Sequence, residues 1–467
     1  MASNRINRPS VRSSYLLLAC LESLGMLTCL LVSMSYTGGH ISGAWFNHLV
    51  CAECIAFVLV VSLAMAAMGL YHARLRGESS ELIARIFLSF ALASVAQAAV
   101  IFFIPYFDIE PKAVALALGS SFVIVCLIRF GFQKLHASDL MKRRIVVLGS
   151  GEKANYIEQR MRRQSDRMGF QILGYVPVTG DSEGVAADVQ LPLEGEALEA
   201  YVYRNQVEEL VIAPDQRRGT LPMQHLYRCR LNGVRVTDIT TFVERESTKV
   251  PLKMLNPSWM IYSDGYHGSN LMLRIAKRTF DLAISLTLLA IIWPVMLITA
   301  LLIMLESGPR APIFYSQERV GRGGVPFWIY KFRSMRVDAE KNGAVWAMTN
   351  DQRITAVGAF IRKYRIDELP QILNVLKGDM SFVGPRPERP QFVDELTETI
   401  PYYGDRHQVK PGLTGWAQIC YAYGASENDA LEKLQYDLYY IKHLSILLDT
   451  VILIQTAEVV LFGKGAR

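Results

Sequence analysis

The sequence predicts a membrane protein of the α plus α/β class that is built from three parts. Four long apolar runs fill its first third, a short strand and a glycine turn open its middle third, and a fifth apolar run with a central proline begins its last third. We therefore expect a four-helix transmembrane domain over residues 1–138, a Rossmann-like α/β domain over 139–268, and a C-terminal domain over 269–467 with a membrane helix of its own.

The composition supports the membrane assignment. Hydrophobic residues make up 51% of the 467 residues, and charged residues make up only 20%, which is below the roughly 25% typical of soluble domains. Such a composition excludes a disordered chain, a collagen-like chain and a small disulfide-stapled protein. The net charge of +6 suits an anionic partner such as lipid headgroups, nucleotides or nucleic acid, without choosing among them.

The four N-terminal runs have the length of membrane-spanning helices. They lie at about 15–36, 49–71, 82–104 and 113–132, each close to the roughly 20 residues that cross a bilayer. Arginine and lysine gather before the first run, around the second connection and after the fourth run. By the positive-inside rule both ends of this block are cytoplasmic. A cleaved signal peptide is excluded, because the first run is too long and three more follow it.

Glutamates and cysteines in or beside these runs are candidates for a functional or metal site. Glu22 and Glu53 lie in or beside the runs, and an intramembrane carboxylate is by default a functional-site hypothesis. We favour residues that face another helix or extend to the membrane surface, because no intramembrane lysine or arginine partner stands out. Cys51 and Cys54 form a lone CxxC without a second pair, so we expect no zinc site.

The middle third begins like a dinucleotide-binding unit. A short apolar strand at 145–148 is followed by Gly149-Ser150-Gly151, which opens a helix. If a ligand binds, its phosphate would sit at Gly149, Gly151 and the helix N-terminus. The motif is the looser GxGxxA form, and the nearest acidic candidate for a ribose, Asp181, lies beyond a glycine. We therefore favour packing, oligomerisation or regulation over catalytic use of a nucleotide.

The fifth apolar run, at 282–305, contains Pro294 at its middle. Proline removes a helix hydrogen bond and clashes with the preceding turn. One interpretation is a plain fifth span, which would place everything after it outside the cell. The other is a re-entrant helix over about 278–305 that breaks at Pro294 and returns to the cytoplasmic face. The dense arginines and lysines that follow favour the second interpretation.

Cations are concentrated after this run in a pattern that fits phosphate chemistry. Arginine offers a bidentate clamp to phosphate oxygens, and a proline on each side of Arg386 would fix the backbone that aims it. The alternative is an interfacial belt that contacts anionic lipid. The candidate phosphate-binding residues are Lys331, Arg333, Arg362, Pro385, Arg386 and Pro387.

An adjacent pair of carboxylates, Asp367-Glu368, follows three cations within four residues. Such a pair can divide its work, since one carboxylate can act as a nucleophile while the other holds Mg²⁺. The alternative is a solvated helix start, where acidic residues are favoured by the helix dipole. The residues alone leave the functional and the structural interpretation about level.

Several long motifs of the last third carry a family resemblance. Residues 274–467 contain, in order, KRTFDLAIS, FYSQERVGRGG, YKFRSM, FIRKYRIDELPQILNVLKGDMSFVGPRPE and VKPGLTGWAQ. This text resembles the bacterial polyprenyl-phosphate hexose-1-phosphate transferases, the monotopic phosphoglycosyl transferases, and the whole chain resembles their long form. The segments YAYGASENDALEKLQYDLYY and LFGKGAR resemble an exopolysaccharide subgroup associated with exosortase systems. Two departures are Tyr364-Arg365-Ile366, where many members have Thr-Ser-Leu, and Trp293, where serine is common.

The resemblance implies a two-step mechanism. Asp367 would attack the sugar-bearing phosphate of a UDP-hexose and release UMP, and undecaprenyl phosphate would then attack the covalent sugar-phospho-aspartate. The cofactor would be Mg²⁺, held by Glu368 and Asp367. Pro294 would set the re-entrant angle. By matching motif positions, Arg362 and Arg386 would grip phosphates, Lys331 would assist near the same site, and Pro385 and Pro387 would fix Arg386. Arg333 is included with them as a candidate for the phosphate grip.

The resemblance also implies partners and a place in the cell. The protein would be a multi-pass protein of the bacterial inner membrane, with its catalytic domain on the cytoplasmic face, and would initiate exopolysaccharide synthesis. Its partners would be a UDP-hexose (glucose or galactose), undecaprenyl phosphate and the bilayer, with no nucleic acid; a homodimer is left open. One alternative is a membrane-anchored nucleotide sensor without transferase activity. A membrane-anchored sugar epimerase or dehydratase is disfavoured, because the middle third has no Tyr-x-x-x-Lys pair.

Overall fold

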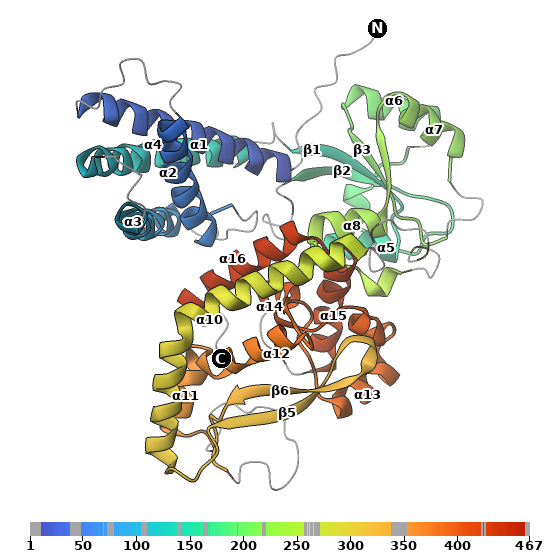
Figure 1. Cartoon of the computed structure of the whole chain (residues 1–467). Helices are drawn as coiled ribbons and strands as arrows, with labels where there is room; N and C mark the ends of the chain where they lie inside the picture. Colours follow the sequence, from blue (N-terminus) through green and yellow to red (C-terminus); the bar gives the residue numbers. More distant parts are fainter. Residues whose placement is uncertain are drawn as a thin grey trace. The chain divides into compact units, whose positions relative to one another are not determined.

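A computed structural model describes residues 11–462, with gaps at 38–47, 69, 72–78, 104–109, 138–141, 162–166, 168, 194, 217–220, 256–258, 260, 262–264, 266–270, 338–352, 422–423 and 425. The chain divides into two compact units, Met1–Ser247 and Thr248–Arg467. Figure 1 shows the first unit in blue and green and the second in yellow to red.

The first unit begins with four helices at the places that the apolar runs predict. They are α1 (Val11–Tyr36), α2 (His48–Ala67), α3 (Ser79–Phe103) and α4 (Pro111–Ala137). Three of them contain stretches long and apolar enough to cross a membrane, and the described side chains of α2 add the shorter apolar run Ala52–Ala67. These helices agree with the membrane protein that the sequence predicts.

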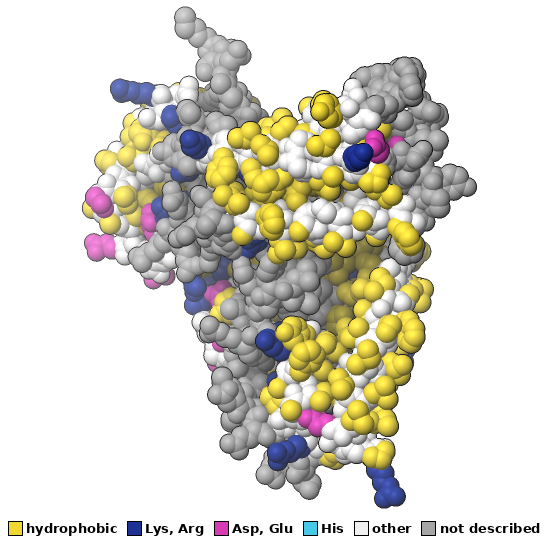
Figure 2. Space-filling model, turned by 90° about the vertical axis from the view of Figure 1, so that its left-hand side faces the viewer, with side chains coloured by type: hydrophobic (Ala, Val, Ile, Leu, Met, Phe, Trp, Pro, Cys, Tyr) yellow, Lys and Arg dark blue, Asp and Glu magenta, His cyan; other side chains and the backbone are white. Residues whose placement is uncertain are grey.

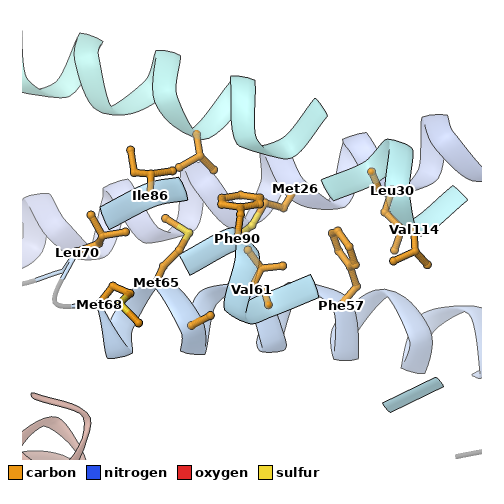
Figure 3. Packing of buried hydrophobic residues seen from close by; sticks show 14 of the residues in the cluster. Met26, Leu30, Phe57, Val61, Met65, Met68, Leu70, Ile86, Phe90 and Val114 are labelled. Atoms are coloured by element: carbon orange, nitrogen blue, oxygen red, sulfur yellow. The ribbon is translucent and has the colours of Figure 1, made fainter. Parts of the chain in front are cut away.

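The four helices share one apolar core (Figure 3). Side chains from different helices meet there, including Met26, Phe57, Val61 and Phe90, all at most 6% exposed. Helices α1 and α4 pack along each other closely. A Cβ at Gly25 would lie 2.9 Å from Cγ2 of Ile124, so a larger residue at this position would force one of the two helices or the Ile124 side chain to shift.

One buried ion pair inside this block overturns an expectation. Arg129 on α4 lies with its Nε 2.7 Å from Oε1 of Glu22 on α1, and its Nη1 donates to the Leu70 carbonyl at 2.7 Å. The view that Glu22 has no arginine partner within the helices was therefore wrong. The sequence did not reveal the pair because 107 residues separate its members and Arg129 counted as part of a cytoplasmic flank.

The rest of the first unit is a parallel sheet with helices between its strands, as the sequence predicts. The strands run in the order β2-β1-β3-β4, and all three neighbouring pairs are parallel. The strands and helices are β1 (Arg143–Leu148), α5 (Glu152–Arg160), β2 (Phe170–Val176), α6 (Glu196–Arg204), β3 (Glu209–Ile212), α7 (Met223–Leu231), β4 (Arg235–Asp238) and α8 (Ile239–Ser247).

The second unit combines one long helix with short strands and helices. Its elements are α10 (Leu271–Ser307), β5 (Phe314–Val320), β6 (Pro326–Phe332), α11 (Ala356–Lys363), the 3-10 segment η5 (Ile366–Gln371), α12 (Ile372–Lys377), β7 (Ser381–Val383), α13 (Pro390–Thr399), the 3-10 segment η6 (Tyr403–Gln408), β8 (Gly412–Thr414), α14 (Trp416–Cys420), α15 (Glu427–Lys442) and α16 (Ile446–Phe462). Strands β5 and β6 form an antiparallel hairpin, and β7 pairs with β8 in parallel.

Helix α10 is continuous, which corrects the predicted break at Pro294. The structure describes 37 helical residues with Pro294 inside. In Figure 1 the ribbon of α10 turns downward where it changes from yellow-green to yellow. A proline removes one hydrogen bond and kinks the helix. Here the helix bends but stays helical on both sides of Pro294. Hydrophobic side chains cover the downward half, where Leu297 and Leu305 are 54% and 82% exposed, and they form the vertical strip in the lower part of Figure 2.

The second unit starts earlier than the predicted boundary at 268/269. Trp416 donates through Nε1 to the Thr248 carbonyl at 3.0 Å, and Lys249 pairs with Glu432 at 2.9 Å. Val250 is fully buried in the core of this unit. The chain therefore enters the C-terminal unit at Thr248, directly after α8.

Candidate active site

The acidic pair lies on η5, a short segment that the chain enters through an unusual turn. Arg365 precedes η5 with a left-handed backbone, φ 58°, which few residues other than glycine adopt. This turn separates η5 from α11 and carries the pair into the interior, where Asp367 and Glu368 are 9% and 8% exposed. The alternative of a solvated helix start is therefore excluded.

Glu368 is surrounded by cations from three segments. Its Oε1 lies 2.6 Å from Nη2 of Arg386 and 3.1 Å from Nζ of Lys331. Arg365 adds a third cation at 3.8 Å. Burial alone would raise the pKa of Glu368, but Arg386 and Lys331 outweigh it and hold the pKa well below its usual range. Glu368 is therefore an anion at neutral pH.

Asp367 has the opposite environment, although it is the next residue. Burial and the negative charge of Glu368 raise its pKa, against the opposing effect of Lys331 and Arg362. Its Oδ1 is buried and accepts no hydrogen bond within the described part of the chain. A buried carboxylate oxygen without a partner is costly and is free to form a bond, as a nucleophile requires.

Two of the predicted phosphate-binding residues lie in this cluster. Lys331 projects from β6 beside the buried Phe332, opposite Tyr315 of β5 in the hairpin register. Burial lowers the pKa of Lys331, while Glu368 favours its charged form. Arg386 follows β7, whose residues Ser381 and Val383 pair with β8. The cluster thus joins three segments that are distant in sequence.

The other predicted residues take different places. Arg362, at the end of α11, acts on Asp367 through its charge. Arg333 is buried at 7% exposure, and among the described residues its Nη2 has no hydrogen-bond partner. The structure gives Arg333 no ion pair with either carboxylate of the described site, so its part in phosphate binding stays a prediction. Arg365 was missed as a contact of Glu368, because the left-handed turn cannot be read from a charge pattern.

The first half of α10 contacts the segment that follows the acidic pair and the strand that precedes Arg386. Arg278 donates to the carbonyls of Val375 and Leu376 at 2.6 and 2.7 Å, at the end of α12, which directly follows η5. Asp281 accepts from the Phe382 amide of β7 at 3.0 Å. Lys277 pairs with Asp449 of α16 at 2.6 Å. The helix that carries the exposed apolar surface therefore also fixes the spacing of the acidic segment and the Arg386 segment.

A Mg²⁺ ion at this site would have Asp367 and Glu368 as its carboxylate ligands and would share its other ligands with a substrate. Among the described residues there is no group of three or more His, Cys, Asp or Glu side chains that could hold a metal. Mg²⁺ is commonly bound by one or two carboxylates together with substrate phosphates. The two adjacent carboxylates, Asp367 and Glu368, would therefore need substrate phosphates to complete such a site, and Mg²⁺ binding here stays a prediction.

The glycine loop of the first unit is filled by the chain's own carboxylates. The Glu152 and Lys153 amides, at the start of α5, donate to Asp215 at 3.1 Å each. A Cβ at Gly151 would lie 2.0 Å from Oδ2 of Asp215. Asp181 accepts from the Ser150 amide at 2.8 Å. The helix N-terminus where a phosphate would sit thus binds Asp215 instead, which weighs against the nucleotide sensor.

Comparison with known proteins points to one family. Residues 272–463 match the family described as bacterial sugar transferase. A UDP-N-acetylgalactosamine-undecaprenyl-phosphate N-acetylgalactosaminephosphotransferase of Aeromonas hydrophila is 43% identical over 245 residues, 52% of this chain and 56% of that protein. A UDP-glucose:undecaprenyl-phosphate glucose-1-phosphate transferase of Escherichia coli (strain K12) is 33% identical over 363 residues, 75% of each chain. A protein of the same name from Xanthomonas campestris pv. campestris is 34% identical over 348 residues, 73% of this chain and 71% of that one.

Proposed function

The chain belongs to the bacterial sugar transferase family and is a phosphoglycosyl transferase, and on that premise we propose that it transfers hexose-1-phosphate from a UDP-hexose to undecaprenyl phosphate. Glucose and galactose are the proposed sugars. The name of the Aeromonas relative adds N-acetylgalactosamine as a donor to be tested. We further propose that the product initiates exopolysaccharide synthesis.

The observation that carries this proposal is the contrast within the acidic pair. Glu368 is held ionised by Arg386 and Lys331, whereas Asp367 has a raised pKa and a free Oδ1. In the first step that oxygen bonds to the sugar-bearing phosphorus, the bond to the UMP oxygen breaks, and UMP leaves with the electron pair. Arg386 and Lys331 would stabilise the charge on the phosphate oxygens. Mg²⁺, when bound at the pair, would neutralise part of the diphosphate charge.

In the second step an oxygen of undecaprenyl phosphate attacks the same phosphorus, and the carboxylate of Asp367 leaves. The enzyme is then regenerated, and the product is undecaprenyl-diphospho-sugar. Because one substrate is soluble and the other is a lipid, the site must lie at the bilayer surface. The exposed apolar half of α10 supports this placement. We propose that α10 bends at Pro294, dips into the bilayer and returns to the cytoplasmic face of the inner membrane.

The direct test of this function is UMP release in the presence of Mg²⁺ and undecaprenyl phosphate. The donors are UDP-glucose, UDP-galactose and UDP-N-acetylgalactosamine. We expect one donor to release UMP and to load the lipid with sugar phosphate. Absence of UMP from all three donors, with folded protein in the membrane, would contradict the proposal.

The re-entrant path of α10 needs a separate test. In a background without native cysteines, Lys433→Cys on α15 should be shielded from an impermeant thiol reagent added outside intact cells. Ser42→Cys, in the first connection and expected outside, is the matched control. Outside labelling of Lys433→Cys would mean that α10 is a plain span and that the site lies apart from cytosolic UDP-sugar.

A further inference from the structure

The loop that presents Arg386 is held at each of its carbonyl oxygens. Four consecutive residues, 385–388, accept one hydrogen bond each through the backbone, and two of the donors are arginine side chains. The donor–acceptor pairs are Gly412 N to Pro385 O at 2.9 Å, Arg406 Nη2 to Arg386 O at 3.0 Å, Arg319 Nη1 to Pro387 O at 3.2 Å, and Val320 N to Glu388 O at 2.9 Å. Since two of the four residues are prolines with fixed φ, this loop has little freedom.

Arg406 is the most buried of these side-chain donors. It lies on η6 with 6% of its surface exposed. Its Nη1 donates to the Tyr403 hydroxyl at 2.6 Å, and its Nη2 donates to Oδ2 of Asp437 at 2.9 Å. Asp437, on α15, is 2% exposed. Burying a guanidinium and a carboxylate is costly unless their hydrogen bonds are satisfied, and here the second Nη2 hydrogen is directed at the Arg386 carbonyl.

This contact bears on the site because the Arg386 side chain is not itself buried. Its side chain is 32% exposed, and its Nη2 reaches Glu368 at 2.6 Å. A half-exposed arginine loses rotamer freedom when it grips a ligand, and a fixed main chain lowers that loss. Groups that are preorganised toward developing charge contribute most to catalysis.

We propose that Arg406 is a positioning residue, which aims Arg386 at Glu368 and the donor phosphates by holding the Arg386 carbonyl. This inference rests on the proposed transferase function. The sequence did not single out Arg406, because the residue lies 20 positions from Arg386 and its hydrogen bond to that residue goes to the main chain.

The test compares Arg406→Met in two backgrounds by initial rates of UMP release. In the otherwise wild-type chain we expect kcat to fall about 10²-fold, as for a misplacement of about 1 Å. In the Arg386→Ala background the same change should lower the residual kcat less than about twofold, because Arg406 then has nothing left to aim. Equal factors in both backgrounds would overturn the inference.

Arg406→Lys covers the case in which Arg406→Met does not fold. Lysine keeps a cation beside Asp437 but lacks the fork that reaches three acceptors, so its kcat should fall in the wild-type background only. Lys249→Met is the matched control, since it breaks another buried ion pair of α15, with Glu432. It should lower the melting temperature and leave kcat unchanged.

The outcomes distinguish a failure of the proposed transferase function from a failure of the positioning role of Arg406. A wild-type chain that releases no UMP from any donor contradicts the proposed function. An active wild-type chain in which the Arg406 variants lower only the melting temperature contradicts the positioning role alone.

Discussion

Two glutamate–arginine pairs, one in each unit, have the same chemistry and different surroundings. Glu22 and Arg129 in the membrane block have side chains that are 0% and 4% exposed. Glu368 and Arg386 in the C-terminal unit have side chains that are 11% and 32% exposed. The first arginine also binds the Leu70 carbonyl, and the second pairs with Glu368 from a side chain that is partly exposed.

The difference is the one expected between a structural pair and a pair that belongs to the proposed phosphate site. Glu22 and Arg129 neutralise each other one to one and join α1 to α4. Around Glu368 the cations Arg386, Lys331 and Arg365 outnumber the two carboxylates of the pair. An excess of positive charge beside an arginine side chain that is 32% exposed suits an incoming phosphate.

The largest expected effect is that of Asp367→Asn. UMP release should fall by more than about 10³-fold, because the amide cannot act as the nucleophile. The melting temperature should stay the same or rise, because burial raises the pKa of Asp367 and its charged form therefore costs stability. Initial rates and thermal unfolding on the same preparation check both. Activity within tenfold of wild type would remove Asp367 from the mechanism.

Arg129→Met should show the opposite pattern. It leaves Glu22 buried without its partner, which costs about 3–5 kcal/mol in stability, while kcat per folded molecule stays unchanged. Thermal stability in detergent and the UMP rate of the folded fraction measure this. Adding Glu22→Gln should recover part of the loss. A drop in kcat without a loss of stability would show that the Glu22–Arg129 pair has a functional role, which would contradict its assignment as a structural pair.

The Arg406–Asp437 pair combines features of both pairs. It is buried like Glu22–Arg129, and it contacts the Arg386 main chain next to Glu368. Burial raises the pKa of Asp437 to about 6, against the opposing effect of Arg406. An acid whose pKa is higher in the folded state contributes stability at low pH and loses it as pH rises through that value. Unfolding free energy should thus fall by up to about 3 kcal/mol between pH 4 and pH 6, and Asp437→Asn should flatten this slope. An unchanged slope in that variant would assign it to other groups.

The smallest effect concerns an exposed charge on the same helix. Ser426 and Asp429 form a capping box at the start of α15, and these hydrogen bonds lower the pKa of Asp429 to about 2. Asp429→Ala should cost about 1 kcal/mol at neutral pH and leave kcat unchanged. The contribution is present above the ordinary pKa and is lost as pH falls through about 2. A change in kcat for this variant would show that stability and activity are coupled through α15.

Features that depend on residues close together in the sequence could be predicted. The four apolar runs, the strand before Gly149, the adjacent acids at 367–368 and the prolines around Arg386 are all visible along the chain. The structure confirms that Lys331, Glu368 and Arg386 meet.

Long-range contacts and backbone conformation could not be predicted in the same way. The Glu22–Arg129 pair joins residues 107 positions apart. The filling of the glycine loop by Asp215 depends on contacts 62 and 63 positions along the chain. At Pro294 the sequence indicated a perturbed helix, but whether the helix breaks or continues past the proline depends on how it packs beyond that residue.

The central claim is that Asp367 becomes covalently bonded to the sugar phosphate. The most direct measurement is the intact mass of the protein after incubation with UDP-sugar and Mg²⁺ in the absence of undecaprenyl phosphate. We expect a mass increase of one hexose phosphate, which disappears when undecaprenyl phosphate is added and never forms in Asp367→Asn. UMP release that requires the lipid acceptor, with no mass increase in the active enzyme, would contradict it.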